Sequence, residues 1–227
     1  MTVSRNTPFQ LVHVGKCGGS SVAIELQRNG FDFEHVHVRR PVFGPDVRYV
    51  ILVRDPVERF VSAFNWRYHL LGQKQSSSEF HEDPIVRLKQ QAEWLFLSHF
   101  QDVNDFAERL VPRIASDVSA MTTMMGLIGH AREGFSWYLD DLLGLLSPSQ
   151  LLGVIAMERF PDDFETVFGF RPEAEQNRHY PSRRKDLSPL GRANLLRELK
   201  PDYRTLDRLA ALASRAGVPM SVVYEPA

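Results

Sequence analysis

Hydrophobic positions along the chain follow two patterns, one typical of buried strands and one typical of helices. Largely apolar stretches, rich in β-branched or aromatic residues, occur at FQLVHV (9–14), FDFEHVHV (31–38), RYVILVRDP (48–56) and SQLLGVIAMERF (149–160). The run at 48–56 is the clearest, because an unbroken apolar segment of this length is typical of a central parallel strand. We therefore predict four strands.

Spacings of three and four between apolar residues predict helices after these strands. After the first strand the helix covers 20–30 and can end at Gly30, and after the third it starts near Pro56 and covers 57–71. The polar segment 72–84 is expected to be a surface loop, and the other helices are expected at 85–100, 103–111, 134–146, 161–170 and, as a pair, 188–217. Ser188 is a plausible N-cap of that pair, with Pro189 in the first turn.

Strands that alternate with helices indicate an α/β fold, here a P-loop-type parallel β-sheet flanked by helices. We expect one domain over residues 1–227, with a mainly helical insertion at 72–146. A hydrophobic content of 43% and a charged content of 24% are those of an ordinary globular chain. The sequence does not specify an oligomeric state.

Charge, cysteine content and hydropathy narrow the function further. A net charge of −1 gives no general affinity for nucleic acid, so anion binding must come from local clusters. The one cysteine, Cys17, excludes an intramolecular disulfide and fits a reducing compartment. The N-terminus lacks the apolar core of a signal peptide, and Asp140, Asp141 and Pro148 interrupt the most apolar region, so we expect a cytoplasmic protein without a membrane segment.

Polar clusters follow the first three predicted strands, at Gly15–Ser21, His35–Arg39 and Arg54–Asp55. Because ligands of parallel sheets bind at the carboxyl ends of the strands, we expect the fold to bring these clusters together.

The first cluster, GKCGGSS, is typical of a loop that holds phosphate groups. Glycines let the backbone approach an anion, the N–H groups at a helix start point toward it, and Lys16, Ser20 and Ser21 add donors. Lys16 precedes Gly18 and Gly19, however, whereas in the kinase-type loop the lysine follows the glycines. This order disfavours magnesium coordination of the usual P-loop kind. The alternative is a tight turn with an exposed lysine.

The second cluster, VRDPVERFVSAF, places Arg54 at a strand end and Ser62 about two helical turns later. An arginine fork and a hydroxyl there can grip a second anionic group. The alternative is that Arg54 only pairs with Asp55 or Glu58.

Together, HVGKCGGSSV and LVRDPVERFVSAF resemble the sulfotransferases that use 3′-phosphoadenosine-5′-phosphosulfate (PAPS), most closely the carbohydrate branch with the heparan and dermatan uronyl enzymes. Members typically have H-x-P-K-T-G-G-T-S and R-D-P-x-x-R-x-x-S; here Gly15, Cys17 and Ser20 replace proline and two threonines. The resemblance implies that Lys16, Cys17, Gly18, Gly19, Ser20 and Ser21 hold the 5′-phosphosulfate and that Arg54 and Ser62 hold the 3′-phosphate. The basic loop near 178–186 would close over the nucleotide through Arg183, Arg184 or Lys185, although a solvated loop is an alternative.

Sulfuryl transfer to a hydroxyl needs a base, and imidazole suits that task near pH 7. His35 and His37 lie two apart on a strand and so face the same side. The resemblance makes His37 the catalytic base, His35 a supporting group and Glu34 an alternative base. A zinc pair without a clear third ligand, or buried structural histidines, are the other interpretations.

These residues predict a PAPS-dependent sulfotransferase that acts on a hydroxyl of a carbohydrate or small-molecule acceptor. PAPS is the expected donor, 3′,5′-adenosine bisphosphate (PAP) the product, and no metal is expected. We expect neither a nucleic-acid nor a membrane partner. A P-loop small-molecule kinase, or a non-catalytic nucleotide-binding protein of the same fold, are the alternatives.

Overall fold

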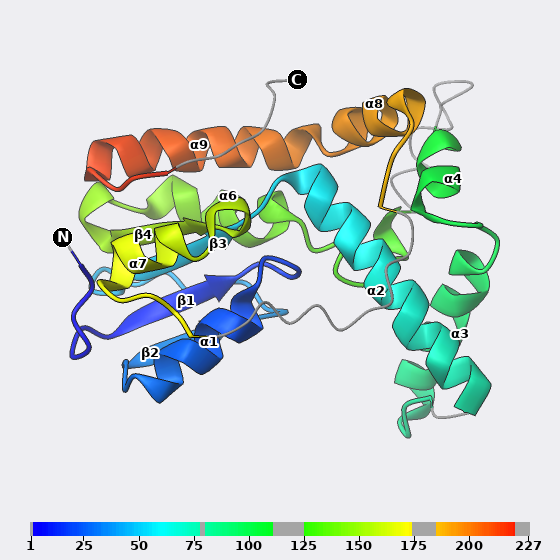
Figure 1. Cartoon of the computed structure of the whole chain (residues 1–227), viewed down its shortest axis with the longest axis horizontal. Helices are drawn as coiled ribbons and strands as arrows, with labels where there is room; N and C mark the ends of the chain where they lie inside the picture. The colour runs from blue at the N-terminus through cyan, green and yellow to red at the C-terminus, as the bar shows by residue number, and fades with distance from the viewer. Residues whose placement is uncertain (1, 78–79, 111–124, 174–184, 221–227) are drawn as a thin grey trace. The chain divides into compact units, whose positions relative to one another are not determined.

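The computed structural model describes residues 2–77, 80–110, 125–173 and 185–220 (Figure 1). The strands of these residues are β1 (Phe9–His13), β2 (Phe33–Val36), β3 (Tyr49–Val53) and β4 (Leu151–Ala156). They form a sheet in the order β2-β1-β3-β4, and each neighbouring pair is parallel. The α/β fold with a parallel sheet that the sequence predicts is therefore confirmed, as are its four strands.

Helices follow the strands along the chain, and those of the first unit flank the sheet. They are α1 (Gly19–Arg28), α2 (Pro56–Ser77), α3 (Pro84–Leu97), α4 (Val103–Glu108), α6 (Phe135–Leu145), α7 (Asp162–Phe168), α8 (Pro189–Glu198) and α9 (Lys200–Ala216), with the short 3₁₀ helices η1 (Pro148–Gln150) and η2 (Met157–Arg159). As predicted, the Ser188 hydroxyl caps α8 by accepting from the N–H of Gly191. Within the described part of the chain, no helix combines the length and the apolar composition that crossing a bilayer requires.

The chain forms two compact units. Of the described residues, the first contains 2–56, 133–173 and 200–220, and the second contains 57–77, 80–110, 125–132 and 185–199. The single domain expected from the sequence stays a prediction, as does the insertion at 72–146. That segment does not act as one body, however, because α6 belongs to the first unit whereas α3 and α4 belong to the second.

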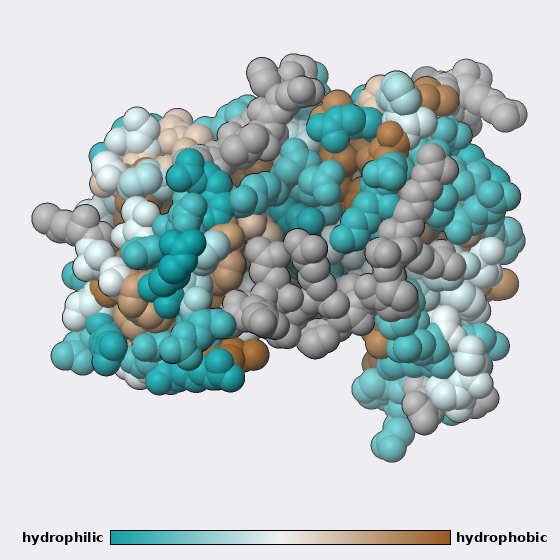
Figure 2. All heavy atoms as spheres, viewed as in Figure 1, coloured by the Kyte–Doolittle hydropathy of each residue, from teal (hydrophilic) through white to brown (hydrophobic). Residues whose placement is uncertain are grey.

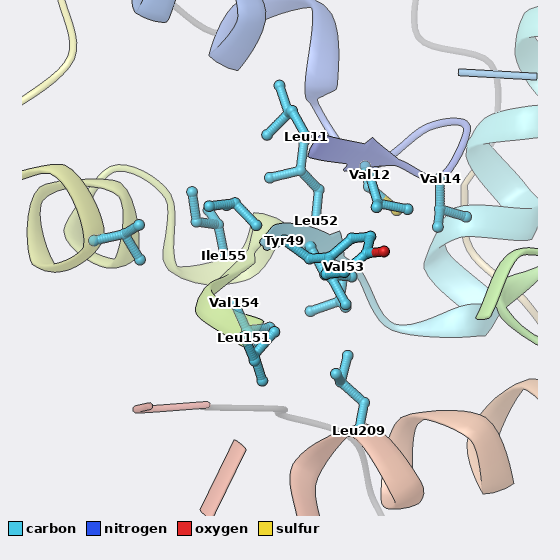
Figure 3. Close-up of a cluster of buried hydrophobic side chains, with 14 of the residues drawn as sticks. Leu11, Val12, Val14, Tyr49, Leu52, Val53, Leu151, Val154, Ile155 and Leu209 are labelled. Atoms are coloured by element: carbon cyan, nitrogen blue, oxygen red, sulfur yellow. The ribbon is translucent and has the colours of Figure 1, made fainter. Parts of the chain in front are cut away.

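The first unit is a three-layer sandwich built on the sheet. The strand residues are almost entirely buried in β1, β3 and β4, so alternate side chains supply the core on both faces. On one face α7 packs so closely that a Cβ on Gly153 would meet the side chain of Val167. On the other face α9 directs Leu209 toward the strands, and Figure 3 shows its side chain pointing from the helix toward the buried cluster.

The connection before α6 depends on a cap supplied from α9. Asp202 accepts hydrogen bonds from the N–H and the hydroxyl of Ser136, both at 2.9 Å. Gly134, the residue before α6, cannot carry a side chain there, because a Cβ would lie 2.3 Å from the Asp202 carboxylate. The helix start is thus satisfied from another element.

The second unit shows where a prediction was wrong. Residues 72–77 were expected in a loop, but α2 continues through them to Ser77. Gly72 allows this close packing, since a Cβ there would lie 3.2 Å from the Trp94 ring of α3, and Lys74 donates to Gln90 of the same helix. The helix therefore continues through polar residues that carry no apolar periodicity.

The surface mixes polar and apolar residues. On the face that Figure 2 shows, hydrophobic residues appear between hydrophilic ones. Exposed large apolar side chains of the described residues include Ile24, Val42, Leu127 and Leu190. Single exposed apolar residues of this kind are ordinary in folded proteins.

Candidate active site at the carboxyl ends of β1, β2 and β3

Three neighbouring strands end at the polar clusters that the sequence singled out. In the sheet β1 lies between β2 and β3, with Val12 opposite Val36 and His13 opposite Leu52. The segments that follow these strands begin at residues 14, 37 and 54, all at the same edge of the first unit. The expectation that the fold places the three clusters at one edge is therefore confirmed.

The loop between β1 and α1 is strained at Lys16. This residue has φ 72°, in the left-handed region that side-chain-bearing residues rarely occupy, and Gly18 follows with φ 74°. Arg54 at the end of β3 donates from Nη1 to the Lys16 carbonyl at 3.2 Å, which holds the strained turn in place. Strain of this kind costs about 1–3 kcal/mol and is often found at functional sites.

The Lys16 side chain is a partly buried cation. Burial, and after it the positive charge of Arg54, lowers the pKa of Lys16 from 10.5 to about 8. Two neighbouring positive groups that are partly removed from water favour binding of an anion, because an anion stabilises both charged forms. The arginine is not merely paired with Asp55 or Glu58, the alternative that the sequence left open, since it bonds to the loop.

The remaining residues of the loop differ in burial, contacts and backbone conformation. Ser20 is exposed and Ser21 half-buried in the first turn of α1, where helix N–H groups lack acceptors within the helix. Cys17 is buried, and its N–H donates to the carbonyl of Val14 at 3.2 Å. Gly18 is needed for its left-handed conformation, and a Cβ on it would also lie 2.4 Å from the sulfur of Met157.

The histidines form a stack that the sequence predicted only in part. His35 and His37 do face the same side, with ring centroids 6.0 Å apart and nearly parallel planes. His13, the last residue of β1, lies against both rings, with centroids 5.2 Å from His35 and 4.1 Å from His37. Sequence reasoning gave His13 no role, although the motif H-x-P-K begins at this position.

The hydrogen bond of His37 fixes its tautomer. Its Nδ1 lies 3.1 Å from the carbonyl oxygen of His13. A carbonyl oxygen only accepts, so neutral His37 carries its hydrogen on Nδ1, and its Nε2 has the lone pair that a base needs. His35 is a weaker base, because burial, then the charges of His37 and Arg39, lowers its pKa.

Glu34, the alternative base, lies elsewhere. Successive strand residues point to opposite faces, so Glu34 is on the face away from His35. It accepts from Gln10 at 2.8 Å and pairs with Arg39, and these two hydrogen bonds lower the pKa of its carboxyl group. A carboxylate held in its charged form by an arginine is a poor proton acceptor, which disfavours Glu34 as the base.

Two predicted residues cannot be placed beside this cluster. Ser62 is half-buried on α2 and belongs to the second unit, so its partnership with Arg54 stays a prediction. Arg184, with Arg183, lies outside the described residues, and Lys185 is the first described residue after them. Their contact with a nucleotide also stays a prediction.

Among the described residues, no group of three or more His, Cys, Asp or Glu side chains is arranged to hold a metal ion. No family model, curated protein or solved structure matches the chain. Its function is therefore inferred from residues and their geometry.

Proposed function

We propose that the protein is a PAPS-dependent sulfotransferase that acts on an alcohol, with His37 as the base. The observation that supports this most is the adjacency in the sheet of β2, β1 and β3, which end in a histidine base, a strained lysine loop and an arginine. Transfer between an anionic donor and a hydroxyl needs these three elements at one edge of one unit.

PAPS would supply a sulfuryl group and leave as PAP. The Nε2 atom of His37 would take the proton of the acceptor hydroxyl, whose oxygen forms the new bond to sulfur. Below pH 8 the Lys16 ammonium is charged and would stabilise the negative charge that develops on the departing phosphate oxygen. The hydroxyl groups of Ser20 and Ser21 and the N–H groups of the first turn of α1 would hold the other oxygens.

Arg54 would serve both the loop and the donor. It holds the Lys16 carbonyl through Nη1, and a guanidinium has five N–H donors, so it can also bind the 3′-phosphate. The sequence resemblance assigns that phosphate to Arg54 and Ser62. The kinase alternative is disfavoured by the position of Lys16 before Gly18, which puts the lysine on the wrong side of the glycines.

The experiment that tests this proposal is the thermal shift of the purified protein with PAP, and separately with ATP and magnesium. A ligand at a hundred times its dissociation constant adds about 2.7 kcal/mol to the free energy of unfolding. We expect a clear shift with PAP that Arg54→Ala abolishes. The matched control is Arg208→Ala, which removes an exposed arginine of α9 that pairs with Asp140, and it should retain the shift.

The other outcomes separate the alternatives. A shift with ATP and magnesium but not with PAP would replace the proposal by the kinase. No shift with either nucleotide would reject both enzymes and leave a fold without its proposed chemistry. A PAP shift that survives in Arg54→Ala would move the 3′-phosphate away from this residue.

A further inference from the structure

His13 is a buried titratable residue that contacts both His35 and His37, and no step of the proposed reaction uses it. It closes β1, directly before the lysine loop, and only 4% of its surface is exposed. A histidine at the end of a buried strand needs a reason beyond filling space, because an apolar residue fills space without polar nitrogens.

The first contact of His13 is with the base. Its ring stacks on the ring of His37 at 4.1 Å with an interplanar angle of 12°, and its carbonyl accepts from Nδ1 of His37 at 3.1 Å. The ring contact limits rotation of His37 about its second side-chain torsion, which is otherwise broad and roughly two-fold. The carbonyl contact stabilises only the ring orientation that directs Nδ1 of His37 toward the carbonyl. Together they hold Nε2 of His37 in one direction.

The second contact is with the anion loop. A Cβ on Gly19 would lie 2.0 Å from Cγ of His13, so the imidazole packs directly against the backbone where α1 begins. Nδ1 of His13 also lies 3.0 Å from Nε2 of His35, a hydrogen bond that fixes the plane of the His13 ring. The same ring thus touches the start of α1 and the base.

We propose that His13 is a positioning residue that sets the ring orientation of His37 relative to the start of α1. The proposal deepens the sulfotransferase function and rests on it for the identity of the base. In this arrangement, the base and the N–H groups of α1 keep a constant separation because one buried ring touches both. His35 fixes that ring at its edge, through the hydrogen bond to Nδ1.

Two substitutions separate the contacts of the His13 side chain, because each keeps one contact and removes the other. The amide nitrogen of His13→Asn takes the place of Nδ1 and can keep the bond to His35, but the flat ring is lost. His13→Phe keeps a flat ring to stack on His37 and loses the bond to His35. A third variant, Gly19→Ala, leaves His13 in the sequence and forces its ring to move. Its control is Gly144→Ala in α6, where a Cβ meets nothing within 4 Å.

The readout is the tautomer of His37, measured by long-range ¹H–¹⁵N correlation spectra of the 8 histidines, with His37→Gln for assignment. We expect the Nδ1–H form in the wild type, in His13→Phe and in Gly144→Ala. We expect a mixture of both tautomers in His13→Asn and Gly19→Ala. Hydrolysis of PAPS, with water as the acceptor, should slow by about 10- to 100-fold in His13→Asn with little change in KM.

A pure Nδ1–H form of His37 in both His13→Asn and Gly19→Ala would overturn the proposal, because the carbonyl alone would then orient the base. If His13→Asn does not fold, Gly19→Ala decides the question with His13 intact. The tautomer is read without any nucleotide. Failure of wild-type protein to bind PAP would therefore reject the sulfotransferase function while the role of His13 in orienting His37 is still decided.

Discussion

Two arginines five residues apart, Arg54 and Arg59, hold the carbonyl groups of strained residues, one in each unit. In the first unit, Arg54 donates to the carbonyl of Lys16, which has φ 72°. In the second unit, Arg59 donates to the carbonyl of His130, which has φ 62°, at 2.6 Å, and to that of Ala131 at 3.2 Å. A hydrogen bond from an arginine to a backbone carbonyl therefore occurs at both strained loops.

The two arginines differ in what surrounds them. Arg59 is fully buried, so we interpret its guanidinium as a structural group of the second unit. Arg54 is half-buried and lies beside Lys16, where its positive charge adds to burial in lowering the pKa of that lysine. A buried cation with carbonyl partners stabilises a fold, whereas neighbouring cations over a strained turn destabilise it. The difference indicates that the second arrangement is kept for binding an anion.

The largest expected effect comes from replacing Arg59, which holds two carbonyl groups in the second unit. Arg59→Met keeps the length of the side chain but leaves the carbonyls of His130 and Ala131 without this donor, and we expect it to lower the free energy of unfolding by about 3 kcal/mol. Arg54→Met should cost about 1 kcal/mol or less, because its single bond is longer and water can replace it. Urea unfolding monitored by circular dichroism measures both. Equal losses would remove the distinction between the two arginines.

A second prediction has the opposite sign for stability. Lys16→Met removes the partly buried cation, and we expect it to raise the free energy of unfolding at pH 7 by about 1 kcal/mol while it abolishes the PAP shift. Lys200→Met, at the exposed start of α9, should change neither quantity. A destabilised Lys16→Met protein would mean that the ammonium supports the fold, contrary to the comparison above.

The pH dependence of this gain follows from the pKa of Lys16. Its folded value is about 8 and its ordinary value is 10.5, so between these pH values the unfolded chain binds a proton that the folded chain does not. Wild-type stability therefore gains a favourable contribution as pH rises from 8 toward 10.5. The advantage of Lys16→Met should shrink over the same range and stay constant below pH 7. An advantage that widens above pH 8 would contradict the lowered pKa.

Much of the first unit is predictable from sequence because its chemistry is local. The unbroken apolar composition of the strand at 48–56 indicates by itself that the strand is buried, and Pro56 does begin α2. The positions of Lys16 and Arg54 at strand ends follow from that pattern together with the general rule for parallel sheets.

What the sequence could not predict depends on contacts between distant residues. The continuation of α2 past Gly72 depends on the ring of Trp94 in another helix. The role of His13 depends on the register that puts β1 beside β2, and on Gly19, which looked like an anion-binding glycine and also makes room for an imidazole. The strain at Lys16 and at Val38 depends on backbone angles that no residue pattern encodes.

The smallest expected effect tests that strain beside the base. Val38 follows His37 with φ 56°, an outlying value for a β-branched residue, and its N–H donates to the Tyr138 hydroxyl at 2.9 Å. Asparagine tolerates the left-handed region, and 52% of Val38 is exposed, so little burial is lost on substitution. Val38→Asn should therefore raise the free energy of unfolding by about 0.5–1 kcal/mol.

The control for this variant is Val42→Asn, an exposed valine of the same connection without a positive φ, which should gain nothing. A gain confined to Val38 would show that the chain keeps a strained residue next to His37 at the expense of stability. Equal behaviour of the two variants would mean that the turn after β2 is relaxed. The case for a functional site at this edge would then depend on the lysine loop and the histidine stack, without support from strain at the base.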